Sequence, residues 1–121
     1  MVSYKYYFSY LIGCINKSAN RKKKGDITIM YVYLMKNLKP LNGEIVKKHV
    51  EHLKDLKSQG KLVLCGPFTD YPGGMVVITA ENLEEATKIA EADPFMACGY
   101  KSFEIRTMEQ ANEENHYLLE E

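Results

Sequence analysis

Short apolar segments alternate with segments of helical spacing along residues 30–107. The apolar segments are rich in β-branched and aromatic residues, and the last of them alternates Phe103 and Ile105 with polar neighbours. Period-two alternation is typical of a half-buried strand. We therefore predict four strands, at residues 30–35, 61–65, 75–79 and 100–107.

Two segments between these strands have the spacing of amphipathic helices. The first covers residues 44–59 and is followed by Gly60, a typical helix end. The second starts after Asn82, which together with Glu85 resembles a capping box. It ends before Pro94, because a residue that precedes proline is disfavoured in helical conformation.

The element order β-α-β-β-α-β predicts the α+β fold class, with a ferredoxin-like antiparallel sheet that carries both helices on one face. The opposite face of such a sheet has no cover from its own chain. The first and third strands are apolar at nearly every position, so their side chains require burial on both faces. We therefore expect a homodimer that packs sheet to sheet.

The segments on either side of this domain have a different composition. Residues 1–29 are aromatic and basic, and we predict an irregular N-terminal extension; the alternative is a basic arm that touches an acidic partner. The ferredoxin-like domain is expected at residues 30–108. Residues 109–121 are rich in glutamate and are predicted to form an acidic tail or a short helix.

Charge and cysteine content exclude several classes of function. Sixteen basic and sixteen acidic residues cancel, so no net field would hold the protein on nucleic acid or on an anionic membrane. The apolar stretch at residues 6–15 is too short to span a bilayer. Three cysteines without metal-binding spacing indicate neither a disulfide framework nor a zinc site, and favour the cytoplasm. No nucleotide or phosphate motif occurs, and we expect no cofactor.

Candidate chemistry centres on His49 and Asp93. At about 100° per residue, His49 falls within the apolar stripe of the first helix, whereas His52 lies near its rim and is expected to be solvated. Asp93 lies on the inner side of the second helix, at a C-terminal end where a carboxylate needs a donating partner. Because the two helices lie side by side, the pair could meet and form a general base.

Less specific interpretations remain open for both residues. His49 could be a neutral core histidine, and Asp93 could be a turn residue that binds its own backbone. The pair His49 and His52 could hold a metal from one helix, but no metal-binding motif accompanies it, and we expect no metal site.

The residues from His49 to Gly60, then Gly66-Pro67 and the segment Ala92-Asp93-Pro94-Phe95, resemble the marks of the YCII-related (YciI-like) family. The resemblance covers roughly residues 30–107, and its spacing matches His49 rather than His52. It implies a dimeric α+β barrel with a pocket in each subunit where the histidine and the aspartate meet. The family looks like it includes a dehydrochlorinase of a chlorinated hydroxyhydroquinone, but most members have no assigned reaction.

Further residues are expected around the pair. Gly66 and Pro67 would let the backbone approach a ligand closely, and aromatic side chains would line an apolar pocket. The proposed substrate-binding set is Gly66, Pro67, Phe68, Phe95 and Tyr33. Cys65 and Cys98 are expected to be buried, inert thiols.

The sequence supports two hypotheses of function. In the first, the protein is a small-molecule enzyme in which His49, oriented by Asp93, moves a proton during an elimination or isomerisation. In the second, the protein is a non-catalytic dimer that binds a metabolite or regulates. The two hypotheses are separated by whether the pair lies within hydrogen-bonding distance in a ligand-sized pocket, and then by turnover.

Overall fold

The computed structural model of the protein describes residues 3–4 and 28–120. The predicted irregular extension at residues 1–29 therefore lies almost wholly outside the described residues, as do the apolar stretch 6–15 and Cys14. Residues 30–107 form one compact unit, and the described residues at the two ends of the chain belong to a second unit. No helix within the described ranges is long and apolar enough to cross a membrane.

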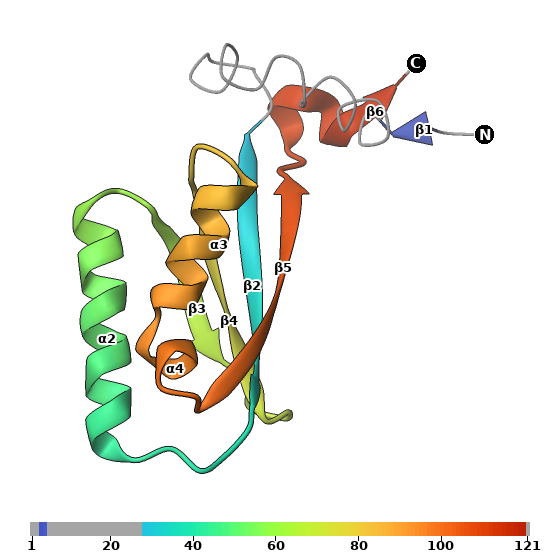
Figure 1. Ribbon diagram of the computed structural model, residues 1–121. Helices are drawn as coiled ribbons and strands as arrows, with labels where there is room; N and C mark the ends of the chain where they lie inside the picture. Colours follow the sequence, from blue (N-terminus) through green and yellow to red (C-terminus); the bar gives the residue numbers. More distant parts are fainter. Residues whose placement is uncertain (1–2, 5–27, 121) are drawn as a thin grey trace. The chain divides into compact units, whose positions relative to one another are not determined.

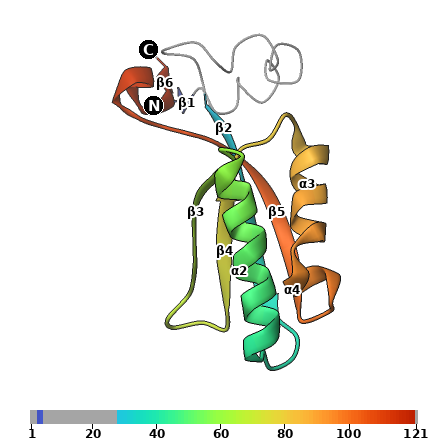
Figure 2. The same ribbon diagram turned by 90° about the vertical axis from the view of Figure 1, so that its left-hand side faces the viewer.

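The larger unit is built on a four-stranded antiparallel sheet, which confirms the predicted fold class. Its strand order is β3-β4-β2-β5, and helices α2, α3 and α4 all cover one face (Figures 1 and 2). The strands are β2 (Ile29–Asn37), β3 (Leu62–Pro67), β4 (Gly73–Ile78) and β5 (Lys101–Glu109). The core lies between the helices and the sheet, where Tyr33, Val76 and Ile78 are fully buried beside Ala86 and Ala90.

Helix α2 (Gly43–Ser58) begins and ends within one residue of the predicted range 44–59. The Asn42 side chain accepts a hydrogen bond from the Ile45 amide at 3.0 Å, which satisfies one of the free donors of the first turn. Gly60 follows the helix with φ of 74°, a conformation that glycine adopts without strain. The apolar stripe of α2 then places His49 against the sheet, among the buried residues of the helix.

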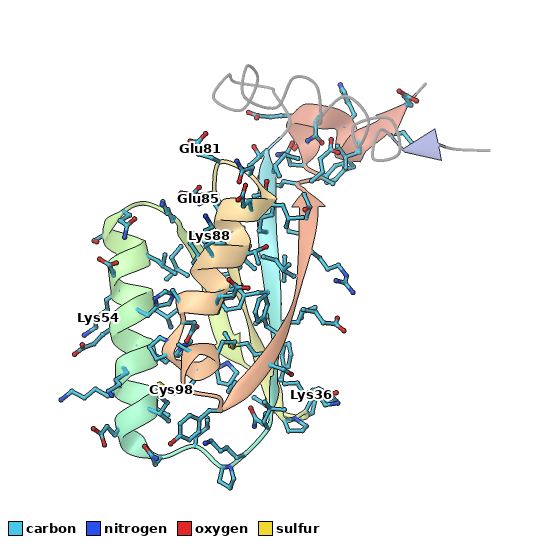
Figure 3. All side chains as sticks on the ribbon, viewed as in Figure 1. Lys36, Lys54, Glu81, Glu85, Lys88 and Cys98 are labelled. Atoms are coloured by element: carbon cyan, nitrogen blue, oxygen red, sulfur yellow. The ribbon has the colours of Figure 1, made fainter. Side chains whose placement is uncertain are left out.

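Helix α3 (Leu83–Ala92) starts at the predicted cap but not with the predicted capping box. The Asn82 side chain accepts from the Glu85 amide at 2.8 Å. The Glu85 carboxylate does not return to Asn82; it accepts from the Glu81 amide and pairs with Lys61 at 3.1 Å. Figure 3 shows Glu81, Glu85 and Lys88 along this part of the molecule.

A second short helix, α4 (Pro94–Ala97), follows directly and was not predicted. Pro94 ends α3, as expected, but it also occupies the first turn of α4, where proline costs no hydrogen bond. Asp93 is therefore both the C-terminal residue flanking α3 and the N-cap of α4, so its side chain meets a helix N-terminus rather than only a C-terminus. This arrangement favours the charged carboxylate.

The loop between β3 and β4 differs from the prediction at both of its ends. Strand β3 continues through Gly66 and Pro67 instead of ending before them, because it is an edge strand on which proline loses no ladder bond. Strand β4 begins at Gly73 rather than at residue 75, so Gly74 lies within the strand. A Cβ at Gly74 would lie 2.6 Å from the Gly66 carbonyl oxygen, so the two strands can approach only with glycine at this position.

The unit at the chain ends contains a short two-stranded pairing. Strand β1 (Ser3–Tyr4) is antiparallel to β6 (Leu119–Glu120). Before β6, a 3-10 helix covers Glu113–Leu118 and is capped reciprocally by Asn112 and Asn115. The residues 109–121 thus contain a short helix and a strand in their described part.

Candidate functional site

His49 and Asp93 meet between the helices and the sheet. His49 Nδ1 lies 2.8 Å from Asp93 Oδ1, and both residues are buried, with exposed fractions of 8% and 0%. Helix α2 supplies the histidine, and the junction of α3 and α4 supplies the aspartate. The structure therefore brings the two residues that the face argument selected into direct contact.

Asp93 accepts three hydrogen bonds with its two oxygens. Besides His49, the Phe95 amide donates to Oδ1 at 3.0 Å and the Tyr33 hydroxyl donates to Oδ2 at 2.8 Å. Burial alone would raise the pKa of Asp93, but the bond and the electrostatic attraction to His49, with the other two donors, lower it below its ordinary value. Asp93 is therefore an ionised carboxylate at neutral pH, and both interpretations of this residue, partner of His49 and cap of its own backbone, are correct.

An ionised Asp93 fixes the protonation of the imidazole. Because the carboxylate can only accept, Nδ1 of His49 must carry the hydrogen that joins them. In a neutral ring the lone pair then lies on Nε2, an atom that makes no hydrogen bond within residues 28–120. His49 is thus arranged as a base whose accepting atom is free.

Tyr33 lies on the other side of the carboxylate. Its side chain is fully buried, and burial followed by the negative charge of Asp93 raises the pKa of the phenol, so it remains a donor. Tyr33 also contacts Phe103 edge to face at 6.2 Å between ring centroids. It supports Asp93 from within the core and does not line the cavity, so the structure places it behind the pair rather than against a ligand.

Phe95 packs against the face of the His49 imidazole. Its ring stacks on that of His49, with centroids 3.9 Å apart and planes 15° apart. The Lys101 ammonium lies 4.4 Å from the centroid of the same Phe95 ring, a cation–π distance. Phe95 therefore links the histidine to a buried lysine on β5.

A cavity of about 430 Å³ opens beside His49. Its volume is within the range of small-molecule sites. The cavity is largely apolar, and three of the five predicted substrate-binding residues, Gly66, Pro67 and Phe95, line it. The remaining lining residues are Met35, Leu41, Val46, His49, Val50, Leu53, Cys65, Gly74, Met75, Val76 and Lys101.

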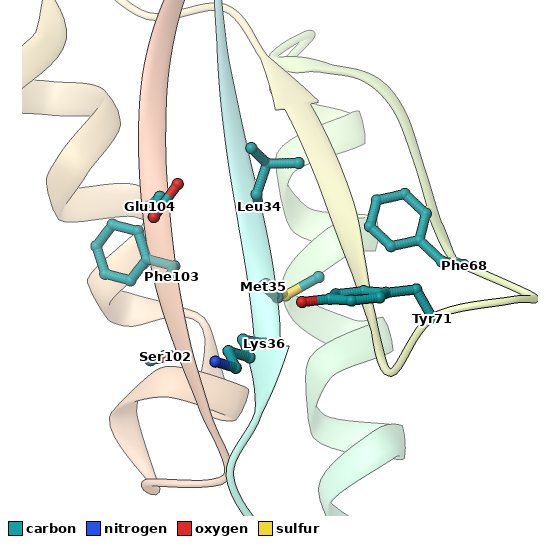
Figure 4. A pocket seen from close by; sticks show the side chains of 8 residues that line it. All are labelled: Leu34, Met35, Lys36, Phe68, Tyr71, Ser102, Phe103 and Glu104. Carbon is teal, nitrogen blue, oxygen red and sulfur yellow. The ribbon is translucent and has the colours of Figure 1, made fainter.

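Phe68 is not at this cavity. It lines a separate hollow of about 350 Å³ together with Tyr71, from the loop after β3, and with Leu34, Lys36 and Glu104 from β2 and β5 (Figure 4). Tyr33 and Lys101 contact the helices, so by alternation along their strands Leu34, Lys36 and Glu104 lie on the opposite, open face of the sheet. The sequence could not show the direction of a side chain that follows the end of an edge strand.

Other expectations about single residues were wrong. His52 is half-buried rather than solvated, and its Nε2 atom is buried without a hydrogen-bond partner among the described residues. Cys65 and Cys98 are exposed free thiols, not buried ones, since Cys65 lies on the edge strand and Cys98 follows the short helix α4. Among the described side chains, no cluster of three or more His, Cys, Asp or Glu could hold a metal.

Lys101 is the site residue that sequence reasoning missed. It is 7% exposed, at the start of β5, and its alternation with exposed Ser102 places it on the helix side of the sheet. Burial lowers the pKa of Lys101, and the nearby charge of Asp93 partly opposes this effect. The signal was present, because Lys101 is in phase with the apolar residues Phe103 and Ile105.

Comparison with known proteins identifies the family. A model of the YCII-related domain matches residues 28–109. The chain belongs to the YCII-related family. A relative of similar sequence, the uncharacterised protein YjpA of Bacillus subtilis (strain 168), is 42% identical over 79 residues, which cover 64% of this chain and 93% of YjpA.

A solved structure shows the same fold as this YCII-related chain. It is the 5-chloro-2-hydroxyhydroquinone dehydrochlorinase TftG of Burkholderia phenoliruptrix AC1100, in complex with 2,5-dihydroxybenzoquinone. The TM-score is 0.53 at 20% identity, and the match covers 71% of this chain and 98% of TftG. At this identity the likeness extends to the fold alone.

Proposed function

We propose that the protein is a small-molecule enzyme in which His49 transfers a proton to and from a ligand held in the cavity. The observation that carries the proposal is the 2.8 Å contact between His49 Nδ1 and Asp93 Oδ1 at the wall of that cavity. A buried carboxylate that orients an imidazole and leaves its second nitrogen free is the arrangement of a general base.

The residues would divide the work of proton transfer as follows. Nε2 of His49 takes a proton from the ligand, and the resulting imidazolium is stabilised by ionised Asp93, which keeps its own charge because three donors hold it. Stacking on Phe95 keeps the ring in plane during the transfer. In an isomerisation the proton then returns from Nε2 to another atom of the ligand. In an elimination the leaving group departs with its bonding electron pair, and the proton passes from Nε2 to that group or to water. In both cases the enzyme ends in its starting state.

The cavity favours a compact and largely apolar substrate. Its volume of about 430 Å³ suits one ring or a short chain, and most of its lining is aliphatic, aromatic or sulfur-containing. The similar fold of TftG, a dehydrochlorinase described with a bound dihydroxybenzoquinone, supports a search among quinones and halogenated phenols. The substrate of TftG itself is not assigned to this chain.

Turnover measurements test the proposal. Wild type, His49→Ala and His52→Ala are incubated with halogenated phenols, quinones and small keto compounds, and loss of substrate is followed by chromatography. His52 lies on the same helix but does not line the cavity, so it provides the matched control. We expect turnover by wild type and His52→Ala, and a reduction of about 10²- to 10⁴-fold in His49→Ala, the usual contribution of general base catalysis.

Equal rates for wild type and His49→Ala would contradict the role of His49. Ligands that bind in the cavity of all variants and are converted by none would instead support the non-catalytic function, a module that binds or senses a metabolite. Binding is measured separately by calorimetry, so the two results are distinguishable.

We also infer that two copies pair through the open face of the sheet. That face carries the hollow at Leu34, Phe68 and Tyr71, and the Phe68 and Tyr71 side chains are 37% and 56% exposed in the single chain. Apolar surface of this kind gains free energy when a partner covers it. Gel filtration with light scattering at micromolar concentration should give the mass of a dimer, and a strictly monomeric particle would contradict this inference.

A further inference from the structure

Lys101 is an unusual component of a mostly apolar cavity. Among the described residues that line the cavity, it is the only lysine or arginine. With 93% of its surface covered, it belongs to a residue type that is almost never buried unless it is paired. A lysine side chain that is covered to this extent requires an explanation in terms of a partner for its ammonium.

The protein itself supplies no such partner within residues 28–120. The contact of the Lys101 ammonium is with the face of the Phe95 ring, and no carbonyl or carboxylate there accepts a hydrogen bond from Nζ. Asp93 is the carboxylate whose charge acts on Lys101, but its oxygens already accept from Tyr33, His49 and the Phe95 amide. The three N–H groups of Lys101 are therefore unused at the wall of an open cavity.

We propose that Lys101 is the anion-binding group of the His49 cavity, and that the ligand is a compact, largely apolar molecule with one negatively charged oxygen. A carboxylate, phenolate or enolate oxygen would accept hydrogen bonds from the ammonium, and charge-assisted bonds of this kind are the strong ones. The apolar remainder of the ligand would lie against Val46, Val50 and Met75. This inference deepens the proposed function because it concerns the same cavity, but it is a statement about binding alone.

The position of Lys101 also fits the proposed chemistry. Removal of a proton by His49 leaves negative charge on the ligand, and in an enolate or phenolate this charge resides on oxygen. The Lys101 ammonium can bind that oxygen because His49 and Lys101 line the same cavity. Both residues also contact the Phe95 ring. Lys101 would then bind the anionic ligand while His49 exchanges its proton.

Binding of matched probes tests the proposal on the full chain. Benzoate and benzamide have nearly the same shape, and only benzoate is anionic. Calorimetric titration at neutral pH should give tighter binding of benzoate than of benzamide to wild type. In Lys101→Met, which keeps the aliphatic stem, benzoate affinity should fall by about 10- to 100-fold, the usual effect of losing a hydrogen bond to a charged group, while benzamide affinity stays unchanged.

Two further variants control for charge and for position. Lys101→Arg retains a cation and should keep the preference for benzoate. Lys36→Met removes an exposed lysine that lines the hollow on the open face, and it should bind both probes as wild type does. A purely structural role of Lys101 predicts the opposite pattern, in which Lys101→Met lowers the melting temperature but leaves the ratio of the two affinities as in wild type.

An independent measurement uses the wild-type protein, so its result does not depend on whether a variant folds. In NMR spectra of wild type, the Lys101 Cε resonance should move when benzoate is added and stay in place with benzamide. Equal affinity of the two probes for wild type, or a Lys101 resonance that ignores benzoate, would overturn the proposal. His49→Gln should retain the preference for benzoate, so a failure of the catalytic role of His49 would leave a different trace from a failure of anion binding.

Discussion

Replacement of Asp93 tests whether this carboxylate is the acceptor of three buried hydrogen bonds. Asp93→Ala leaves the hydrogen of His49, the Tyr33 hydroxyl and the Phe95 amide without an acceptor in a fully buried place. Each stranded donor costs about 1–3 kcal/mol, although the imidazole can change its tautomer and the hydroxyl can rotate. We therefore expect a loss of about 3–6 kcal/mol in the free energy of unfolding, near the usual cost of breaking a buried pair.

Asp93→Asn is expected to be milder. The amide oxygen can still accept from His49 and Phe95, and the Tyr33 hydroxyl can rotate to accept from the new amide nitrogen, so the change removes the charge and keeps the shape. Three charge-assisted bonds become neutral, and the relief of burying a charge offsets part of that loss. A net destabilisation of about 1–3 kcal/mol follows.

The pH dependence of this difference has a definite sign. The pKa of Asp93 is lowered in the folded protein relative to its ordinary value of 3.8, so near that pH the unfolded chain binds more protons than the folded one. The advantage of wild type over Asp93→Asn is thus fully present above pH 3.8 and is lost as the pH falls through the folded-state pKa. Urea unfolding at a series of pH values measures it, with Asp70→Asn, at an exposed turn position, as the matched control.

A different pattern would refute the reasoning. If Asp93→Asn matched Asp70→Asn in stability at every pH, the carboxylate would not be a charged acceptor of three donors. If its deficit relative to wild type widened as the pH fell below 3.8, the folded-state pKa would have to lie above its ordinary value.

Three further predictions concern the surroundings of the site. Tyr33→Phe removes one donor to Asp93, so it should cost about 1–2 kcal/mol by urea unfolding and raise the apparent pKa of Asp93 in an NMR titration; an unchanged titration would show that the bond is not formed. Gly74→Ala places a methyl group against the backbone of β3 and should lower the melting temperature by several degrees, whereas Gly43→Ala, with nothing within 4 Å, should not; equal effects would contradict the close approach of the strands. Asn82→Ala removes the N-cap of α3 and should cost about 1 kcal/mol, and a neutral result would mean that the cap is replaced by solvent.

Periodicity was sufficient for the fold and for the pair, for one physical reason. A helix stripe that must face the sheet determines which side chains point inward, so the 3.6-residue period separated His49 from His52. Both helices lie on one face of the sheet, so Asp93, at the C-terminal end of α3, was expected to lie near His49 on α2. These constraints are local in sequence or general to the fold, so they can be recognised from one amino-acid sequence.

Features that depend on a neighbour distant in sequence could not be predicted in this way. The contact of the Lys101 ammonium with the Phe95 ring depends on the short helix α4, and α4 itself depends on a proline that can end one helix and begin another. The direction of Phe68 and the exposure of Cys65 follow from the edge position of β3, which the strand order determines.

The protonation of His49 tests the central claim most directly. In a ¹⁵N-edited NMR spectrum recorded at pH 8, wild type should show His49 with hydrogen on Nδ1 and a lone pair on Nε2, because ionised Asp93 can only accept. In Asp93→Asn the requirement is relaxed, and a share of the Nε2-protonated tautomer should appear. A wild-type spectrum with hydrogen on Nε2 and none on Nδ1 would contradict the account, because the base that we propose would then have no free accepting atom toward the cavity.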